Sequence, residues 1–177
     1  RLASGKRING AADDSAGLAI ASRLTAEARG LDMAARNAAD GQALLDTAES
    51  AHNEVANILQ RMRELAVQGA NDTNGTADRT NIRLELTELK EEIDAIASQT
   101  KWAGSTLISA ATTFKFQVGD EGSEQLTVTT SLVSASALSV TSISALTTSA
   151  AFTSYVDTVN SAIATVAEFR AELGANS

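Results

Sequence analysis

The sequence predicts a mainly α protein, an elongated antiparallel helical bundle with a small β-hairpin region. Two long stretches in the N-terminal half carry apolar residues at helical spacing, and a third such stretch returns near the end of the chain. Between them, two short segments alternate apolar and polar residues around a glycine-rich turn. The 177 residues are 44% hydrophobic but only 3% aromatic, so the core must consist mostly of Ala, Leu, Ile and Val, which suit close-packed helices.

The N-terminal part combines a glycine-interrupted opening with a long helix. Residues 1–27 are expected to form a loop or short helix that becomes helical over 15–24. Residues 28–69 contain no proline and little glycine, and predict one helix of about 40 residues, roughly 60 Å long at 1.5 Å per residue. The apolar face of this helix comprises Leu44, Ala48, Ala51, Val55, Ile58, Met62, Leu65 and Ala66.

A polar turn is expected to separate this helix from a second one over residues 78–99. Gly69 is expected to end the first helix, and GANDTNGTADR supplies the turn. Asp78 or Thr80 can then cap the second helix. Helices joined by a short turn are expected to pack antiparallel. The second helix has a coiled-coil seam with spacings of 4, 3, 4 and 3, formed by Ile82, Leu86, Leu89, Ile93 and Ile96.

A β-hairpin and a short variable region are predicted over 105–153. FKFQVG and EQLTVTT alternate apolar and polar residues around the turn GDEGS, a pattern typical of a hairpin. Residues 131–153 are rich in Ser, Thr and Ala without a steady period, and are expected to be loop or irregular structure. The helical period returns over 154–174, so a third helix is expected to pair with the first two.

The charge and residue types argue against several functions. The chain has 14 Lys and Arg against 22 Asp and Glu, a formal charge of −8, whereas nucleic-acid binding requires the opposite sign. Without cysteine there is no disulfide, thiolate nucleophile or thiolate metal site. No run approaches the ~20 apolar residues of a membrane helix, so no membrane insertion is expected. Because the chain starts at Arg1 rather than Met, we expect it to be a piece of a longer protein.

Five blocks, in one order, resemble bacterial flagellin. They are RLASGKRINGAADDSAGLAIASRL, RGLDMAARNAADGQALLDTAESAHNEVANILQRMRELAVQGANDT, IRLELTELKEEIDAIASQTKWAGSTLI, FKFQVGDEG and VDTVNSAIATVAEFRAELGA. The resemblance implies the inner rod domain of the flagellar filament subunit, with both terminal coiled-coil segments absent and only a short insert in place of large outer domains. Trp102 and Ala103 stand where the family commonly has Phe-Asn, which we interpret as a change in packing.

The resemblance also implies partners and a location. These are other flagellin subunits in a homopolymer, and, for the full-length parent, the flagellar export apparatus, an export chaperone and the filament cap. The subunit would leave the cell by the flagellar type III export route, without a cleaved signal peptide, and would lie in the extracellular filament. Ser and Thr residues over 105–113 and 127–154 are potential O-glycosylation acceptors on the same resemblance.

Candidate interface residues follow from the same resemblance. Gln60, Arg61 and Leu65 match the flagellin surface recognised by the vertebrate flagellin-sensing Toll-like receptor, and Glu92 matches a further contact. The same helix faces neighbouring subunits in a filament. On the alternative interpretation Leu65 is a core residue, and Arg61 and Arg63 are solvated.

Three charged residues near the N-terminus form a second candidate interface. Arg7, Asp13 and Asp14 are expected to hold the N-terminal loop against an adjacent subunit through charge-assisted hydrogen bonds. Such bonds would contribute little as exposed pairs and more at an interface.

No residue pattern predicts an enzyme, a metal or a cofactor. His52 is the only histidine, with Glu49 one turn before it, and one imidazole is too few ligands for a zinc site or an HExxH motif. We expect His52 to be packed or solvated. Glu91, Glu92 and Asp94 form a carboxylate cluster that the seam pattern places mostly outward, as on a solvated helix face.

The sequence therefore predicts a structural, self-assembling filament subunit for motility. Without its terminal segments, this chain is expected not to polymerise alone. Two alternatives remain open: a hook–filament junction protein, which shares the terminal plan, and a cell-surface flagellin homologue that binds polysaccharide. The second would need aromatic platforms, for which Trp102 and Tyr155 are scarce material.

Overall fold

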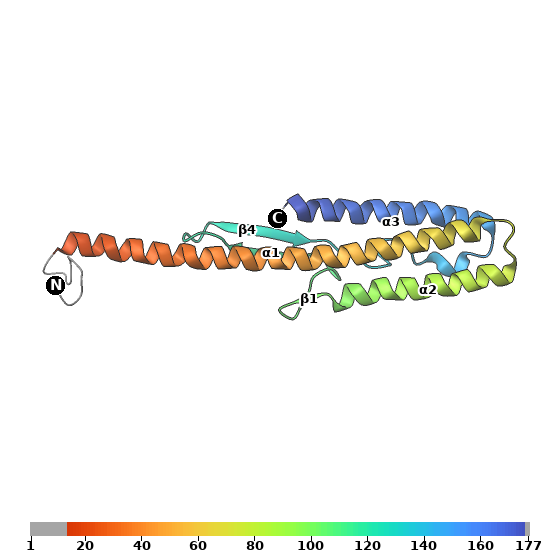
Figure 1. Cartoon of the computed structure of the whole chain (residues 1–177), viewed down its shortest axis with the longest axis horizontal. Coiled ribbons are helices and arrows are strands. Elements are labelled where there is room, and N and C mark those ends of the chain that lie inside the picture. Colours follow the sequence, from red (N-terminus) through yellow and green to blue (C-terminus); the bar gives the residue numbers. More distant parts are fainter. Residues whose placement is uncertain (1–13, 176–177) are drawn as a thin grey trace. The chain divides into compact units, whose positions relative to one another are not determined.

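The computed structural model describes residues 14–175, which are mainly α-helical with short strands between the helices (Figure 1). This confirms the predicted fold class. By contact density the described chain divides into two units: unit 1 contains residues 14–41 and Lys115–Thr127, and unit 2 contains Gln42–Phe114 and residues 128–175. In order, the elements are α1 (Ser15–Ala70), α2 (Thr76–Gln99), β1 (Lys101–Trp102), β2 (Ser105–Thr106), β3 (Thr112–Gln117), β4 (Gln125–Thr130), η1 (Ser142–Ala145) and α3 (Ser149–Ala175).

The helix α1 is continuous from Ser15 to Ala70, so the predicted boundary between residues 27 and 28 is wrong. Its first turn is capped by Asp14, whose Oδ1 accepts the Gly17 amide at 2.8 Å. Residues 18–29 are then mostly strong helix formers and include neither glycine nor proline, so the helix continues through them. A Cβ at Gly30 would lie 2.9 Å from the Cβ of Asp120, so this glycine lets the β3–β4 loop approach the helix.

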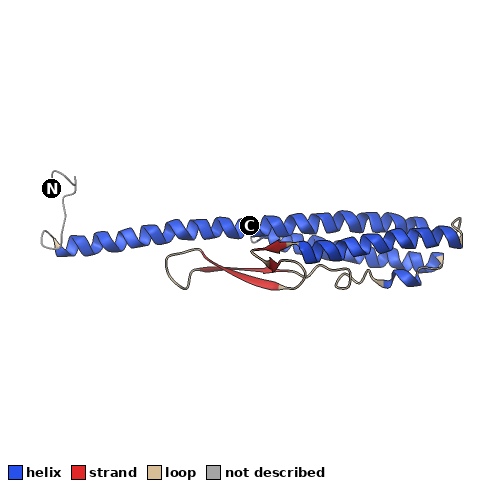
Figure 2. Ribbon diagram, turned by 90° about the horizontal axis from the view of Figure 1, so that it is seen from below, coloured by secondary structure: helices blue, strands red, loops and turns tan. Residues whose placement is uncertain are grey.

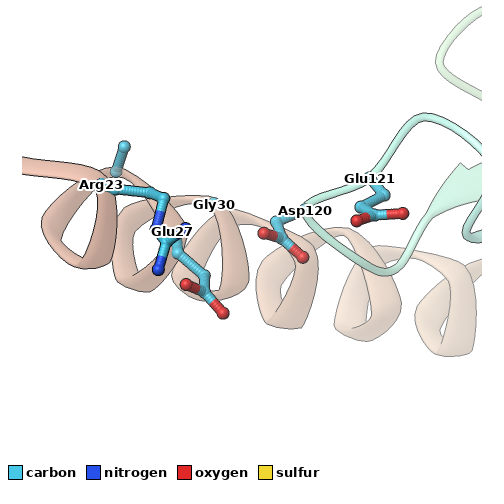
Figure 3. Close-up of a pocket in the computed structure, with 6 residues that line it drawn as sticks. Arg23, Glu27, Gly30, Asp120 and Glu121 are labelled. Carbon is cyan, nitrogen blue, oxygen red and sulfur yellow. The ribbon is translucent and has the colours of Figure 1, made fainter. Parts of the chain in front are cut away.

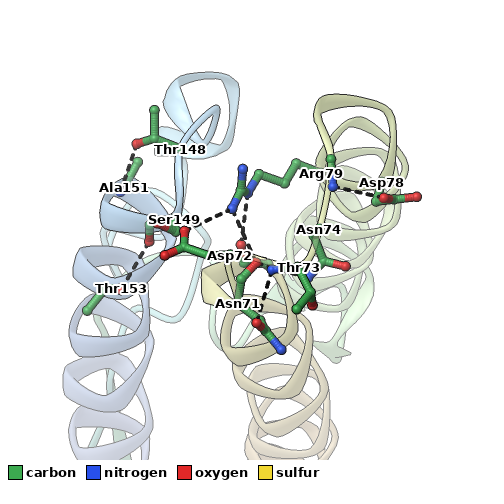
Figure 4. Close-up of polar contacts among 12 residues, drawn as sticks. Asn71, Asp72, Thr73, Asn74, Asp78, Arg79, Thr148, Ser149, Ala151 and Thr153 are labelled. Carbon is green, nitrogen blue, oxygen red and sulfur yellow. Dashed lines mark hydrogen bonds and ion pairs between the residues drawn. The ribbon is translucent and has the colours of Figure 1, made fainter.

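Gly69 does not end α1, contrary to the prediction. The helix continues to Ala70, and a Cβ at Gly69 would lie 2.5 Å from the Phe152 ring of α3. This glycine therefore serves close packing between two helices. The end of α1 is satisfied instead by Arg79, whose Nε donates to the Gly69 carbonyl at 3.1 Å (Figure 4 shows this turn).

The helix α2 begins at Thr76, two residues before the predicted start. Asp78 is not the cap: it lies in the first turn, and its carboxylate accepts the Gly75 amide at 2.9 Å. Within unit 2, α2 and α3 both run antiparallel to the C-terminal half of α1, as predicted (Figure 1). Their shared core comprises Val55, Leu59, Met62, Leu65 and Ala66 of α1, Ile82, Leu86 and Ile93 of α2, and Phe152, Tyr155, Val159, Ala162 and Val166 of α3.

The segment between β4 and α3 is irregular, as predicted, but it also contributes to the core. It is fixed at two points: Asp94 Oδ1 accepts the Ala135 amide at 2.9 Å, and the buried Tyr155 hydroxyl donates to the Val140 carbonyl at 2.8 Å. Asp94 is thus an anchor rather than part of a solvated carboxylate cluster. The buried residues of the segment between β4 and α3 are Val133, Ala135, Leu138, Val140, Ile143 and Leu146. The helix α3 follows from Ser149, five residues earlier than predicted.

Two short strand pairs complete the described chain (Figure 2 shows them in red). The predicted hairpin is β3–β4, in which the Val118 amide donates to the Glu124 carbonyl at 3.0 Å. The β1–β2 pair was not predicted. Its two turn residues, Ala103 and Gly104, have φ of 47° and 87°, as a type I′ turn requires. Replacement of the family's Asn by Ala103 therefore affects the backbone of this turn, and the interpretation as a change in packing stays a prediction.

Candidate functional site

Arg61 is the centre of a charged network between α1 and α2. Its Nε and Nη2 donate to Glu85 Oε1 at 3.1 and 2.7 Å, and its Nη1 donates to Glu64 Oε2 at 3.0 Å. Hydrogen bonds to Glu85 and then to Glu64 raise the pKa of Arg61. All three side chains remain about half exposed or more, so the network contributes little to stability. The network holds the guanidinium of Arg61 in a fixed position on the surface.

Glu85 was missed by the sequence analysis, although the position of the α1–α2 turn predicts that it lies beside Arg61. The α1–α2 turn spans residues 71–75 and is centred on residue 73, so antiparallel helices place residues equidistant from it side by side. Arg61 and Glu85 each lie twelve residues from that centre (73 − 61 = 85 − 73).

The other interface candidates separate into exposed and buried residues. Gln60 and Glu92 are exposed, and Glu92 lies seven residues after Glu85, hence on the same side of α2. No hydrogen bond or ion pair joins Gln60, Arg61 and Glu92 to one another within residues 14–175. We call Gln60, Arg61, Glu64, Glu85 and Glu92 the charged face.

Leu65 does not belong to this face. Its side chain is 2% exposed and lies in the unit 2 core, so the alternative interpretation of a core residue is confirmed and the surface assignment is wrong. Arg63 is also not simply solvated, because its Nε donates to Asn160 Oδ1 of α3 at 2.7 Å. The two arginines of the QRMRE segment thus face different neighbours: Arg61 faces α2, and Arg63 faces α3.

Of the three N-terminal candidates, only Asp14 lies within the described residues. Asp14 caps α1 through the Gly17 amide, a local role that the sequence analysis did not assign. Arg7 and Asp13 lie outside the described residues.

His52 of α1 is fully buried against α3, so of the two expected states, packed or solvated, the structure shows the packed one. Its side chain is 0% exposed, its ring centroid lies 6.2 Å from that of Phe169, and neither ring nitrogen has a hydrogen-bond partner. Burial lowers the pKa of His52 to about 4, with a further lowering by Arg170 and an opposing effect of Glu49. Over residues 14–175 no group of three or more His, Asp or Glu side chains could hold a metal ion.

Unit 1 contains an open cavity of about 590 Å³ between α1 and the β3–β4 loop (Figure 3). Charged side chains dominate its lining, which consists of Arg23, Ala26, Glu27, Gly30, Asp120 and Glu121. This lining includes no hydroxyl, thiol or imidazole that could act as a nucleophile or as its base. None of the described helices is both long and apolar enough to span a bilayer.

Packed helical seams and charged helix faces define a class of fold, an antiparallel helical bundle. The family model of the bacterial flagellin N-terminal helical region matches residues 1–113. The chain belongs to the bacterial flagellin family.

Two curated flagellins are similar to this chain in sequence, and one solved flagellin structure is similar to it in fold. Flagellin D of Vibrio anguillarum is 49% identical over 125 residues, which cover 70% of this chain and 33% of that protein. Flagellin D of Vibrio cholerae is 46% identical over 130 residues, covering 73% and 34%. The crystal structure of Bacillus cereus flagellin aligns with a TM-score of 0.66 at 29% identity, covering 79% of this chain and 81% of that one. The chain spans about a third of the length of the curated relatives it matches.

Proposed function

We propose that this chain is part of a subunit of the bacterial flagellar filament, with a structural rather than an enzymatic role. The observation that carries the proposal is the antiparallel bundle of unit 2, in a chain whose first 113 residues match the flagellin family. Close-packed helices resist bending and shear because each displacement would expose apolar surface along the whole seam. The exposed faces of α1 and α2 then remain available for contacts with other subunits.

The proposed location and partners follow from this role. The full-length parent is exported by the flagellar type III route, with its chaperone and cap, and assembles with other flagellin subunits outside the cell. The hook–filament junction protein and the polysaccharide-binding homologue have no observation of their own within residues 14–175.

An exchange experiment tests the filament role directly. Residues 1–113 of this chain would replace the matching segment of Vibrio anguillarum flagellin D, expressed in a strain without its own flagellins. Filaments seen by electron microscopy, together with restored swimming, are the expected result. A chimera that is exported and helical by circular dichroism but forms no filaments would contradict the proposal. The Leu59→Asp chimera, which places a carboxylate in the unit 2 core, serves as the unfolded control.

A second function is recognition by the flagellin-sensing Toll-like receptor through Gln60, Arg61 and Glu92. The favouring observation is that these side chains are exposed, and that Glu85 and Glu64 hold the Arg61 guanidinium in place. Preorganised arginines make strong interface contacts because little side-chain entropy is lost on binding.

The two neighbouring arginines supply a matched test of receptor recognition. In a receptor-reporter assay we expect Arg61→Ala to lose most of the signal and Arg63→Ala, which removes the contact to Asn160 on α3, to retain it. Circular dichroism checks that both variants stay helical. Equal signals from the two variants, or a silent intact chain, would remove this assignment and leave the filament role untouched.

A further inference from the structure

The α1 helix carries a coiled-coil seam that one polar residue interrupts. Within unit 2, Leu45, His52, Leu59 and Ala66 are spaced by seven residues and are all buried, at 3%, 0%, 0% and 0% exposure. A second line at the same spacing lies beside the first and consists of Ala48, Val55, Met62 and Gly69. His52 is the single polar side chain on these two lines over residues 45–69.

α3 covers this seam. Phe152 packs on Gly69 at the start of α3, and Phe169 packs beside His52 near its end. The imidazole thus lies where a coiled coil usually places a leucine or isoleucine. An apolar side chain of similar volume would leave no polar atom unpaired there, whereas both nitrogens of His52 lack a partner.

The charged groups acting on His52 come from two elements. Glu49 lies one turn earlier on α1, and Arg170 lies on α3, with its Nη2 3.4 Å from Glu49 Oε1. The Nε of Arg170 is buried and, like the imidazole, has no partner. No charged side chain of α2 is among the groups that act on this histidine.

We infer that His52 makes the α1–α3 seam acid-labile: protonation of its imidazole puts a buried cation without an acceptor near the partly exposed guanidinium of Arg170, and α3 separates from α1. A neutral imidazole can remain in an apolar seam at the cost of its unpaired nitrogens. An imidazolium there would carry a full charge with no acceptor, and a buried charge without a partner is far more costly than a buried neutral group.

The direction of the pH effect follows from proton binding. The histidine pKa is 6.5 in an unfolded chain and about 4 in the folded one, so between these values the unfolded chain binds the proton and the folded chain does not. The contribution of neutral His52 to the free energy of unfolding is therefore fully present above pH 6.5 and is lost as the pH falls toward 4. Between pH 7.5 and pH 5, the unfolding equilibrium constant should rise roughly 30-fold because of this one group.

Because the chain contains one histidine, proton NMR reports on this group without assignment. In the folded chain the ring-proton shifts should titrate with a midpoint near pH 4. A midpoint near 6.5 while the chain is folded would show a solvated imidazole and overturn the inference. This measurement needs no variant.

Unfolding in urea at pH 7.5 and pH 5 gives the second test. His52→Leu should lose the roughly 30-fold pH effect that the intact chain shows, and His52→Gln, which stays polar but cannot titrate, should lose it as well. An unchanged pH effect in either folded variant would overturn the inference, because carboxylates elsewhere would then account for it.

Amide hydrogen exchange shows which helix becomes less protected when the pH is lowered. After correction for intrinsic rates, lowering the pH from 7.5 to 5 should reduce amide protection in residues 149–175 more than in residues 76–99. Equal losses in the two helices would assign the acid effect to the whole bundle and contradict its assignment to the α1–α3 seam.

Discussion

The two units use apolar side chains of the same helix in different ways. In unit 2, α1 contributes Leu44, Val55, Leu59 and Met62 to a core in which each is 0% exposed. In unit 1, α1 carries comparably large apolar side chains that stay 37% to 53% exposed, namely Leu18, Ile20, Leu24, Leu31 and Met33. A helical apolar pattern therefore predicts which side chains can be buried, and only a packing partner decides which of them are.

The helix has different support in the two units. In unit 1 its described residues depend on helix propensity, the Asp14 cap, and contacts with the β3–β4 hairpin such as the bond from Asn37 Nδ2 to the carbonyl of Gln117, the last residue of β3, at 2.9 Å. In unit 2 the helix is fixed by tertiary packing along the α2 and α3 seams. Packing is the stronger support, because helix propensity alone leaves most helices marginal in water.

Two leucines at the same heptad position make the largest test of this contrast. Leu59 is 0% exposed and Leu24 is 53% exposed, and 35 residues, or five heptads, separate them (59 − 24 = 35). Leu59→Ala should lower the free energy of unfolding by about 2–5 kcal/mol. Leu24→Ala should change it by no more than about 0.5 kcal/mol. Urea unfolding followed by circular dichroism measures both; a comparable loss from Leu24→Ala would show that its side chain is buried in solution.

Two helical glycines give a test of intermediate size. A Cβ at Gly69 in unit 2 would lie 2.5 Å from the Phe152 ring, so Gly69→Ala should destabilise the chain by about 1–3 kcal/mol. A Cβ at Gly41 in unit 1 would lie 3.3 Å from the Phe116 ring, so in Gly41→Ala the gain in helix propensity should nearly offset the tight contact.

Gly174 in α3 is the control for the glycine series, because a Cβ there would meet nothing within 4 Å. Gly174→Ala should be neutral or slightly stabilising in the same unfolding assay. If Gly69→Ala also stabilised the chain, the close approach of α3 to α1 at residue 69 would be wrong.

The last test concerns a backbone position rather than a core one. Ala103 has φ of 47°, a conformation that costs an alanine about 1 kcal/mol and that asparagine or glycine adopts more readily. Ala103→Asn should therefore raise the free energy of unfolding by about 1 kcal/mol or less. A thermal melt of the two chains, with Ser105→Asn in the same hairpin as control, distinguishes this conformational effect from a general effect of asparagine.

The fold was largely predictable from the sequence because its main signals are periodic. The seams of α1, α2 and α3 follow from helical spacing, the antiparallel order of α1 and α2 from the short turn between them, and the β3–β4 hairpin from alternation around a turn. Local chemistry was harder to assign. Gly69 has the sequence signature of a helix end but serves the approach of Phe152, and Asp78 looks like a cap but lies in the first turn of α2. For Gly69 the deciding contact comes from a residue of another helix that sequence spacing does not identify, whereas Asp78 contacts Gly75, three residues before it.

The candidate site was only partly predictable, for a related reason. Arg61 was identified by resemblance, but its partner Glu85 comes from another helix and required the register of the turn. Leu65 matched a surface motif and is a core residue, because a helical pattern cannot distinguish the edge of a seam from its centre until the second helix is in place.

Native-state hydrogen exchange on the intact 177-residue chain at neutral pH tests the difference between the units most directly. The account predicts that amides in residues 44–70, 82–97 and 152–173 exchange only by global unfolding, whereas amides in residues 18–33 exchange through local opening at much lower free energy. Equal protection along the whole of α1 would contradict it, because the exposed apolar face of unit 1 would then be as firmly supported as the packed seam of unit 2.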